Sequence, residues 1–210
     1  MQPDDPSEAT PTPDGKTPPK IRALLAEREL LLALKENVRR TKESYQQLAS
    51  FYRKEGDFDA SIVCCHRLAA LENDLELKAR SLITAGCVAE QKGDFEAAAG
   101  YYREALALEP MQQDAWYFIH NNLGFSFNQM GRFAEGEKCC RAAIEICFAR
   151  PNGHKNLGMA LSGQGRFREA AQSYHTAMKV APDDPRSFDL LRNLLREHPE
   201  LRNDFGHGLR

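Results

Sequence analysis

Residues 157–167 have the sequence LGMALSGQGRF, and residues 123–133, LGFSFNQMGRF, closely resemble them. Two further copies lie upstream, AGCVAEQKGDF at 85–95 and LASFYRKEGDF at 48–58. Every copy places a Gly or Ala seven positions before a Gly-x-Phe turn, and the turn glycines are Gly56, Gly93, Gly131 and Gly165. Recurrence at a nearly fixed interval predicts a chain of repeated structural units.

The segment after each turn repeats as well. It carries a small residue and, four positions later, a larger one, giving the pairs Ser61 and Cys65, Ala98 and Tyr102, Gly136 and Cys140, Ala170 and Tyr174. Two antiparallel helices approach closely where one presents Gly or Ala and the other fills the gap. The turn glycine can adopt a positive φ at the helix end. We therefore expect helix pairs, each covering the apolar face that its neighbour leaves open.

This pattern resembles the tetratricopeptide repeat (TPR) family. Aligned on the turn, the four units run over residues 42–75, 79–112, 117–150 and 151–184. The resemblance implies an all-α, right-handed superhelical solenoid of about four TPR helix pairs, with N- and C-terminal capping helices. The first unit is the least certain, because it has Leu48-Ala49 where the other units have a glycine at the second position, and it has Asn73 in place of the closing proline.

The two ends of the chain differ from the repeats. Residues 1–20 are expected to form a disordered, proline-rich tail, because prolines lack the amide donors that helices need. Residues 21–41 carry an amphipathic helical stripe that could cap the first repeat, continue into it as one long helix, or pair with its copy in a dimer. We favour a monomer. Asp184-Pro185 starts a capping helix over 185–198, followed by a tail over 199–210.

Composition limits the classes of function. Of 210 residues, 28 are basic and 30 acidic, so the formal charge of −2 does not favour nucleic acid. No stretch has the roughly 18 to 20 apolar residues of a membrane-spanning helix, so no membrane insertion is expected. The N-terminus lacks the apolar core of a signal peptide, which predicts a cytoplasmic protein.

The sequence offers little chemistry. It has no glycine-rich phosphate loop, no nucleophile elbow and no metal-ligand spacing, so we predict no cofactor, no metal site and no enzyme activity. The six cysteines lack a C-x-x-C motif. Cys64, Cys65, Cys139 and Cys140 are expected to pack as apolar groups, whereas the register points Cys87 to the inner face. His120 and His154 occupy the same slot of successive repeats, which favours a packing role.

The resemblance implies that the first helix of each repeat lines a concave groove that binds a peptide or helix of a partner protein. The candidate groove residues are Arg53, Arg80, Phe118, Asn121, Asn122, Phe125, Asn128, Asn152, Lys155, Asn156 and Met159. Asn122 and Asn156 could pair with the backbone of an extended peptide, or could bond only within the repeat stack. The aromatic residues and Met159 would add apolar pockets, and Lys155 with the arginines would favour an acidic ligand.

The predicted function is a non-catalytic interaction scaffold or adaptor. The carboxylate clamp of TPR co-chaperones is not expected, since at its five positions this chain has Ile83, Cys87, Asn122, Asn152 and Asn156, and only the central asparagine matches. The alternative is a secretion- or assembly-type chaperone that holds an unfolded client and could dimerise through residues 21–40.

Overall fold

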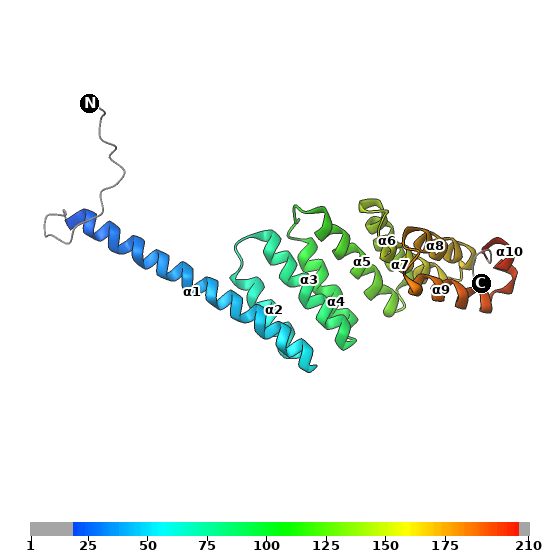
Figure 1. Ribbon diagram of the computed structural model, residues 1–210, viewed down its shortest axis with the longest axis horizontal. Coiled ribbons are helices and arrows are strands. Elements are labelled where there is room, and N and C mark those ends of the chain that lie inside the picture. The colour runs from blue at the N-terminus through cyan, green and yellow to red at the C-terminus, as the bar shows by residue number, and fades with distance from the viewer. Residues whose placement is uncertain (1–18, 206–210) are drawn as a thin grey trace, which may run out of the picture. The chain divides into compact units, whose positions relative to one another are not determined.

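A computed structural model describes residues 19–205, and all regular structure within them is helical (Figure 1). The predicted disordered tail lies, up to residue 18, outside the described residues, as do residues 206–210. Two compact units, residues 1–41 and 42–210, are distinguished by their internal contacts and are described separately. No helix between residues 19 and 205 is both long and apolar enough to cross a membrane.

The first unit contributes the start of helix α1 (Pro19–Glu55), which continues without a break into the second unit. Of the alternatives that the sequence left open, one long helix is therefore observed. The large apolar side chains of this segment are 37–61% exposed; they are Ile21, Leu24, Leu25, Leu30, Leu31, Leu32, Leu34 and Val38. Whether they cap the first repeat stays a prediction.

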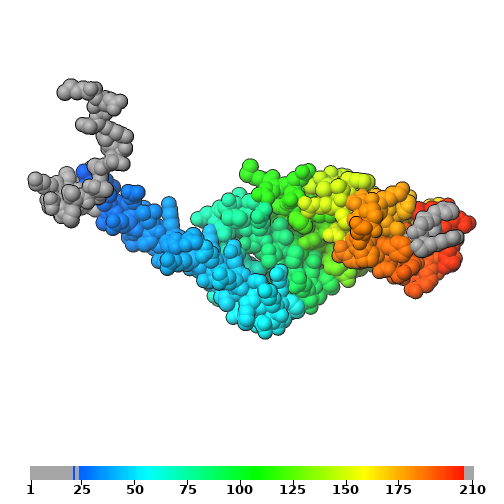
Figure 2. Space-filling model, in the orientation of Figure 1, coloured from blue at the N-terminus to red at the C-terminus, as the bar shows by residue number. Residues whose placement is uncertain are grey.

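The second unit is a stack of helix pairs, which confirms the predicted all-α solenoid. The end of α1 is followed by α2 (Phe58–Leu71), and the next pairs are α3 (Leu75–Lys92) with α4 (Phe95–Leu106), α5 (Gln113–Gln129) with α6 (Phe133–Ile146), and α7 (Pro151–Gly163) with α8 (Phe167–Val180). In the space-filling view these helices follow one another in chain order from cyan to orange (Figure 2).

The turn inside each pair has the conformation that the sequence predicts. Gly56, Gly93, Gly131 and Gly165 all have positive φ, between 73° and 85°, which L-residues adopt only with strain. The residue after the glycine precedes the second helix. In the first two turns it is an aspartate whose carboxylate accepts a bond from a backbone N–H in the first turn of that helix. In the last two turns it is an arginine paired with a glutamate three positions later.

Close contact of the paired helices depends on the small residue of the first helix. An added Cβ at Gly86 would lie 2.5 Å from the ring of Tyr102, and one at Gly158 would overlap the ring of Tyr174. Both rings are buried, Tyr102 completely. Each tyrosine therefore fills the space that the missing side chain leaves, as the alternation of small and large residues predicts.

The C-terminal end is covered by helix α9 (Pro185–Glu197), whose Leu191, Leu194 and Leu195 join the core around Tyr174. The sequence predicted a tail from residue 199 onward. The structure instead has a 3₁₀ turn, η1 (Pro199–Leu201), and a short helix α10 (Arg202–Phe205). Their Leu201 and Phe205 are buried in the same core, so the apolar surface of the last repeat extends beyond Pro199.

Candidate functional site

A polar groove of about 360 Å³ crosses the inner helices of the C-terminal half of the stack. Its walls come from α3, α5, α7 and α9. Seven of its ten lining residues are among the predicted groove residues, namely Asn121, Asn122, Phe125, Asn152, Lys155, Asn156 and Met159. We call this the asparagine groove.

The asparagine amides form a ladder between neighbouring repeats. Asn156 Nδ2 donates to Asn121 Oδ1 at 3.1 Å, and Asn121 Nδ2 donates to Asn122 Oδ1 at 2.9 Å. Asn122 Nδ2 lies 3.3 Å from the hydroxyl of Tyr102 and 3.5 Å from Cys87 Sγ. The bonding within the stack that the sequence left open is therefore present. Asn152, by contrast, is exposed.

Two predicted groove residues are more deeply placed than expected. Asn128 is 5% exposed, donates from Nδ2 to the backbone oxygen of Asn156 at 2.8 Å, and does not line the groove. Lys155 Nζ lies 2.6 Å from Asp184 Oδ2, and its side chain is 7% exposed. Lys155 therefore does not offer a ligand the unpaired cation that the sequence suggested.

Asp184 connects the groove wall to the capping helix. Its Oδ1 accepts from Arg186 N at the start of α9, and its carboxylate also pairs with the Arg186 side chain. The hydrogen bonds from Arg186, and then from Lys155, hold the pKa of Asp184 well below its usual range. The groove end is thus fixed by an ionised carboxylate between two cations.

Glu90 of α3 lines the asparagine groove although the sequence did not single it out. Its Oε1 accepts a hydrogen bond from Ser126 Oγ at 2.9 Å. Burial raises the pKa of Glu90 to about 7, despite that bond. The repeat register could have indicated Glu90 from the sequence. Glu90 lies three positions before Gly93, just as Asn128, a predicted groove residue, lies three positions before Gly131.

Arg186 and Leu190 of α9 complete the groove. They lie beyond the last repeat, so the repeat register assigned them no position on the inner face. Their separation of four positions places both side chains on one side of α9.

Phe118 lies outside the asparagine groove. Its ring is 43% exposed, and the Arg150 guanidinium lies 4.9 Å from the ring centre. Arg150 also lies 4.6 Å from the centre of the Tyr117 ring. This is the geometry of a cation–π contact between the two ends of one repeat, 117–150.

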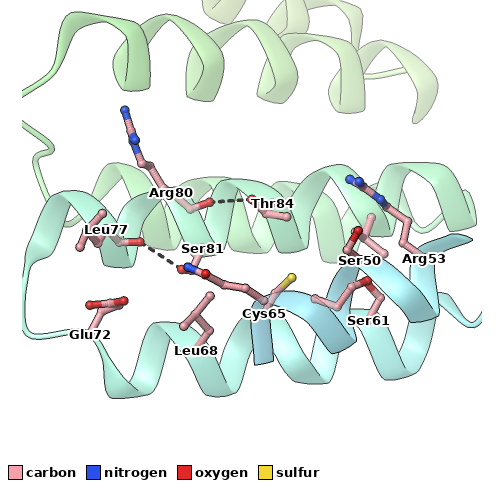
Figure 3. A pocket seen from close by; sticks show the side chains of 13 residues that line it. Ser50, Arg53, Ser61, Cys65, Leu68, Glu72, Leu77, Arg80, Ser81 and Thr84 are labelled. Atoms are coloured by element: carbon pink, nitrogen blue, oxygen red, sulfur yellow. Dashed lines mark hydrogen bonds between the residues drawn. The ribbon is translucent and has the colours of Figure 1, made fainter. Parts of the chain in front are cut away.

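The remaining two predicted residues, Arg53 and Arg80, line a separate pocket of about 320 Å³ in the first two repeats (Figure 3). Its walls come from the end of α1, from α2 and from α3, all within the second unit. We call this the arginine pocket. Nine of the eleven predicted groove residues are therefore divided between two pockets, and Phe118 and Asn128 line neither of them.

His120 and His154 pack against aromatic rings, and Cys64, Cys65 and Cys140 are buried, while Cys139 is half-buried. His120 stacks on Trp116 with ring centres 6.0 Å apart, and burial lowers the pKa of His120. The ring of His154 packs edge-on against Phe148. All six cysteines are free, and burial raises the pKa of Cys65 to about 11. Within residues 19–205, no three His, Cys, Asp or Glu side chains are grouped so that they could hold a metal ion.

Comparison with known proteins locates the repeats. Models described as tetratricopeptide repeat match residues 44–79, 79–111, 119–149 and 154–187. No curated protein sequence matches the chain significantly.

Several solved structures share the fold at low sequence identity. MamA from Desulfovibrio magneticus RS-1 is 15% identical, with 78% of this chain and 88% of that chain covered and a TM-score of 0.64. A chain of the APC/C hetero-tetramer Cut9-Hcn1 is 18% identical, with 73% and 30% covered and a TM-score of 0.62. The second TPR domain of human RPAP3, solved in complex with the HSP70 peptide SGPTIEEVD, is 21% identical, with 58% and 98% covered and a TM-score of 0.52.

Proposed function

Because the chain belongs to the tetratricopeptide repeat family, we propose that it is a non-catalytic interaction scaffold that binds a peptide or helix of a partner protein in the asparagine groove. The observation that carries this proposal is the convergence of seven predicted residues from two neighbouring repeats on one groove. The peptide complex of the RPAP3 domain supports a peptide as the class of ligand.

The groove supplies two kinds of contact. The exposed amide of Asn152 offers a donor and an acceptor to a peptide backbone. Phe125, held edge-on against Phe95 at 6.0 Å, and the half-buried Met159 offer apolar surface. Such a mixture suits an extended segment whose backbone is held by amides while one or two side chains enter apolar pockets.

We place the protein in the cytoplasm. Six free cysteines persist most readily in a reducing compartment, and a disulfide would be the usual form in an exported protein.

Co-purification tests the proposal. The full chain with an affinity tag is expressed in the native organism, and its partners are identified by mass spectrometry. We expect Met159→Ala combined with Asn152→Ala to reduce the recovered partner at least tenfold. Asn156 is unsuitable for this test, because its amide supports the stack.

Lys138→Ala is the matched control, since Lys138 is exposed on the outer helix α6 and does not line the groove. Partner recovery should be unchanged in this control. If the double variant retained every partner at the level of the unmodified chain, the groove assignment would be wrong.

A second candidate is a chaperone that holds an unfolded client and dimerises through residues 21–40. The observation in its favour is the group of exposed large apolar side chains between Ile21 and Val38. Sedimentation velocity separates the candidates. The chaperone predicts a dimer that Leu31→Gln with Leu34→Gln converts to a monomer, whereas the scaffold predicts a monomer for both chains.

A further inference from the structure

The arginine pocket differs in chemistry from the asparagine groove. Its floor is apolar, with Ala49, Cys65, Leu68 and Val88 all buried. Arg80 and Arg53 lie toward opposite ends of the pocket (Figure 3). The pocket therefore combines an apolar floor with a cation at each end.

Two acidic side chains near this pocket are largely buried. Glu72 is paired with Lys42, whereas Glu76 Oε1 has no hydrogen bond within the described part of the chain and lies 3.9 Å from Arg80 Nε. Glu72 Oε2 lies 2.6 Å from Lys42 Nζ, and the Glu72 side chain is 7% exposed. The Glu76 side chain is 15% exposed, and its Oε2 accepts a bond from Gln112 N. Both carboxylates are largely buried and each lies near a cation, so the exposed charges of the pocket are the two guanidinium groups.

The guanidinium groups remain available. Both arginines are exposed. Arg80 donates to the Gln112 side chain at 2.9 Å, and its distance of 3.9 Å from Glu76 is at the limit of an ion pair. Among residues 19–205, no hydrogen bond or ion pair of the Arg53 guanidinium is found.

Three of the hydroxyl groups of the pocket donate to backbone oxygens. Ser61 Oγ donates to Ala49 O at 2.8 Å, Ser81 Oγ to Leu77 O at 3.1 Å, and Thr84 Oγ1 to Arg80 O at 2.9 Å. These hydroxyls therefore have no hydrogen left for a ligand. Gln46 and Ser50 add neutral donors to the lining, and the charged donors are the two guanidinium groups, which prefer carboxylates.

We propose that the arginine pocket binds an acidic segment of the partner protein, with two carboxylate side chains on Arg53 and Arg80 and an apolar side chain on the floor between them. This inference rests on the proposed function, because it assumes that the chain binds a partner protein and adds that a bound segment of that partner is acidic. The sequence alone assigns the preference for an acidic ligand to Lys155 together with the arginines. Because Asp184 neutralises Lys155, we instead assign this preference to Arg53 and Arg80 in the first two repeats.

The repeat register gives the spacing of the two carboxylates. Arg53 is the twelfth residue of the unit 42–75, and Arg80 is the second residue of the unit 79–112. Ten positions correspond to about 15 Å along a helix, and neighbouring helices lie about 10 Å apart. The diagonal is about 18 Å, which an extended chain spans in about five residues. We therefore expect the two acidic side chains of the bound partner segment to lie about four to six residues apart in its sequence.

Selection from a phage-displayed library of random dodecapeptides tests this inference with the full chain. We expect the selected peptides to carry two acidic residues at that spacing around an apolar residue. The strongest peptide is then synthesised with an amidated C-terminus, so that only side-chain carboxylates remain, and its Kd is measured by fluorescence polarisation. The Kd should rise with salt concentration, because exposed charges are screened.

Arg53→Ala and Arg80→Ala should each weaken this peptide at least tenfold, as should exchange of its acidic residues for lysine. Lys54→Ala is the matched control, since this exposed residue follows Arg53 but does not line the pocket. The Kd of the Lys54→Ala variant for the peptide should equal that of the unmodified chain. Selected peptides without acidic enrichment, no selected peptide at all, or full affinity of both arginine variants would each overturn the inference.

The same peptide separates this inference from the proposed function. Loss of binding with Met159→Ala and Asn152→Ala, but not with the arginine variants, would leave the proposed function standing and overturn the acidic pocket. Binding that none of these variants changes would overturn both.

Discussion

At the scale of single residues, Gly158 shows how the repeat signature becomes packing. The ring of Tyr174 occupies the space where a Gly158 side chain would lie. Gly86 and Tyr102 stand at the same offset in an earlier repeat, so this contact could be predicted from the sequence. How deeply each side chain of the groove is buried could not be predicted in the same way.

Gly158→Ala should destabilise the chain by about 1–3 kcal/mol, because the new methyl group overlaps a buried ring that cannot move freely. The free energy of unfolding in urea measures this change. Gly100→Ala is the control, since Gly100 lies inside α4 and, beyond its chain neighbours and the nearby backbone of α4 itself, no atom lies within 4 Å of the place that its methyl group would take. That substitution should stabilise the chain by about 0.5–1 kcal/mol. Equal effects of the two would contradict the packing argument.

Glu90 is a residue whose environment the sequence did not reveal. A glutamate between Ala89 and Gln91 has the ordinary pattern of a solvated helix position. Its burial depends on α5 supplying Ser126 beside it, a contact between repeats. Such contacts follow from the stacking geometry, which the interval between repeats does not specify.

The raised pKa of Glu90 predicts a pH dependence of stability. Its pKa of about 7 in the folded chain exceeds the unfolded value of about 4.3. Between these values the folded state holds a proton that the unfolded state has lost, so this group makes stability fall as pH rises. Glu90→Gln should therefore raise the free energy of unfolding by roughly 1–3 kcal/mol at pH 8 and by much less at pH 5. A gain of the same size at both pH values would contradict the assignment.

At the scale of elements, the Asp184 carboxylate joins the start of α9 to the repeats, in addition to the core packing of its leucines. Asp184 caps the helix start and pairs with the buried Lys155 of α7. The Asp-Pro start signal and the leucine stripe predicted this helix from the sequence. The pairing with Lys155 joins two distant positions of the chain, and neither motif indicates it. The helical turn over 199–205 was missed because Pro199 resembles a stop signal, while the core that buries Leu201 is formed by other elements.

Asp184→Ala should destabilise the chain by about 3–5 kcal/mol, because it leaves the Lys155 ammonium buried without a partner. Since the pKa of Asp184 is lowered by folding, this stabilisation is complete at neutral pH and is lost progressively as the pH falls below about 4. Hydrogen exchange should speed up in the amides of α9.

Asp189→Ala is the control for this variant. It removes an ion pair to Arg192 between two exposed side chains, and it should change stability by no more than about 0.5 kcal/mol. Slow exchange in α9 of the Asp184 variant would refute the role of Asp184.

At the scale of the whole molecule, the repeat period predicted the family and the helical architecture. It also named seven of the ten residues that line the asparagine groove, because first-helix positions can be numbered from the turn glycine. It could not divide these residues between two sites. The two pockets differ in the charge that they expose. Lys155 is neutralised by Asp184, a residue distant in the sequence, whereas Arg53 and Arg80 stay exposed.

The central claim is that the inner face of the stack holds a partner protein. Photo-crosslinking in the native organism tests it most directly, with benzoylphenylalanine placed at Met159 on the inner face or at Lys138 on the outer face. We predict a discrete crosslinked species from position 159, with one protein identified in it by mass spectrometry, and none from position 138. Crosslinks from position 138 to the same protein with equal yield, or no crosslink from position 159, would contradict the claim.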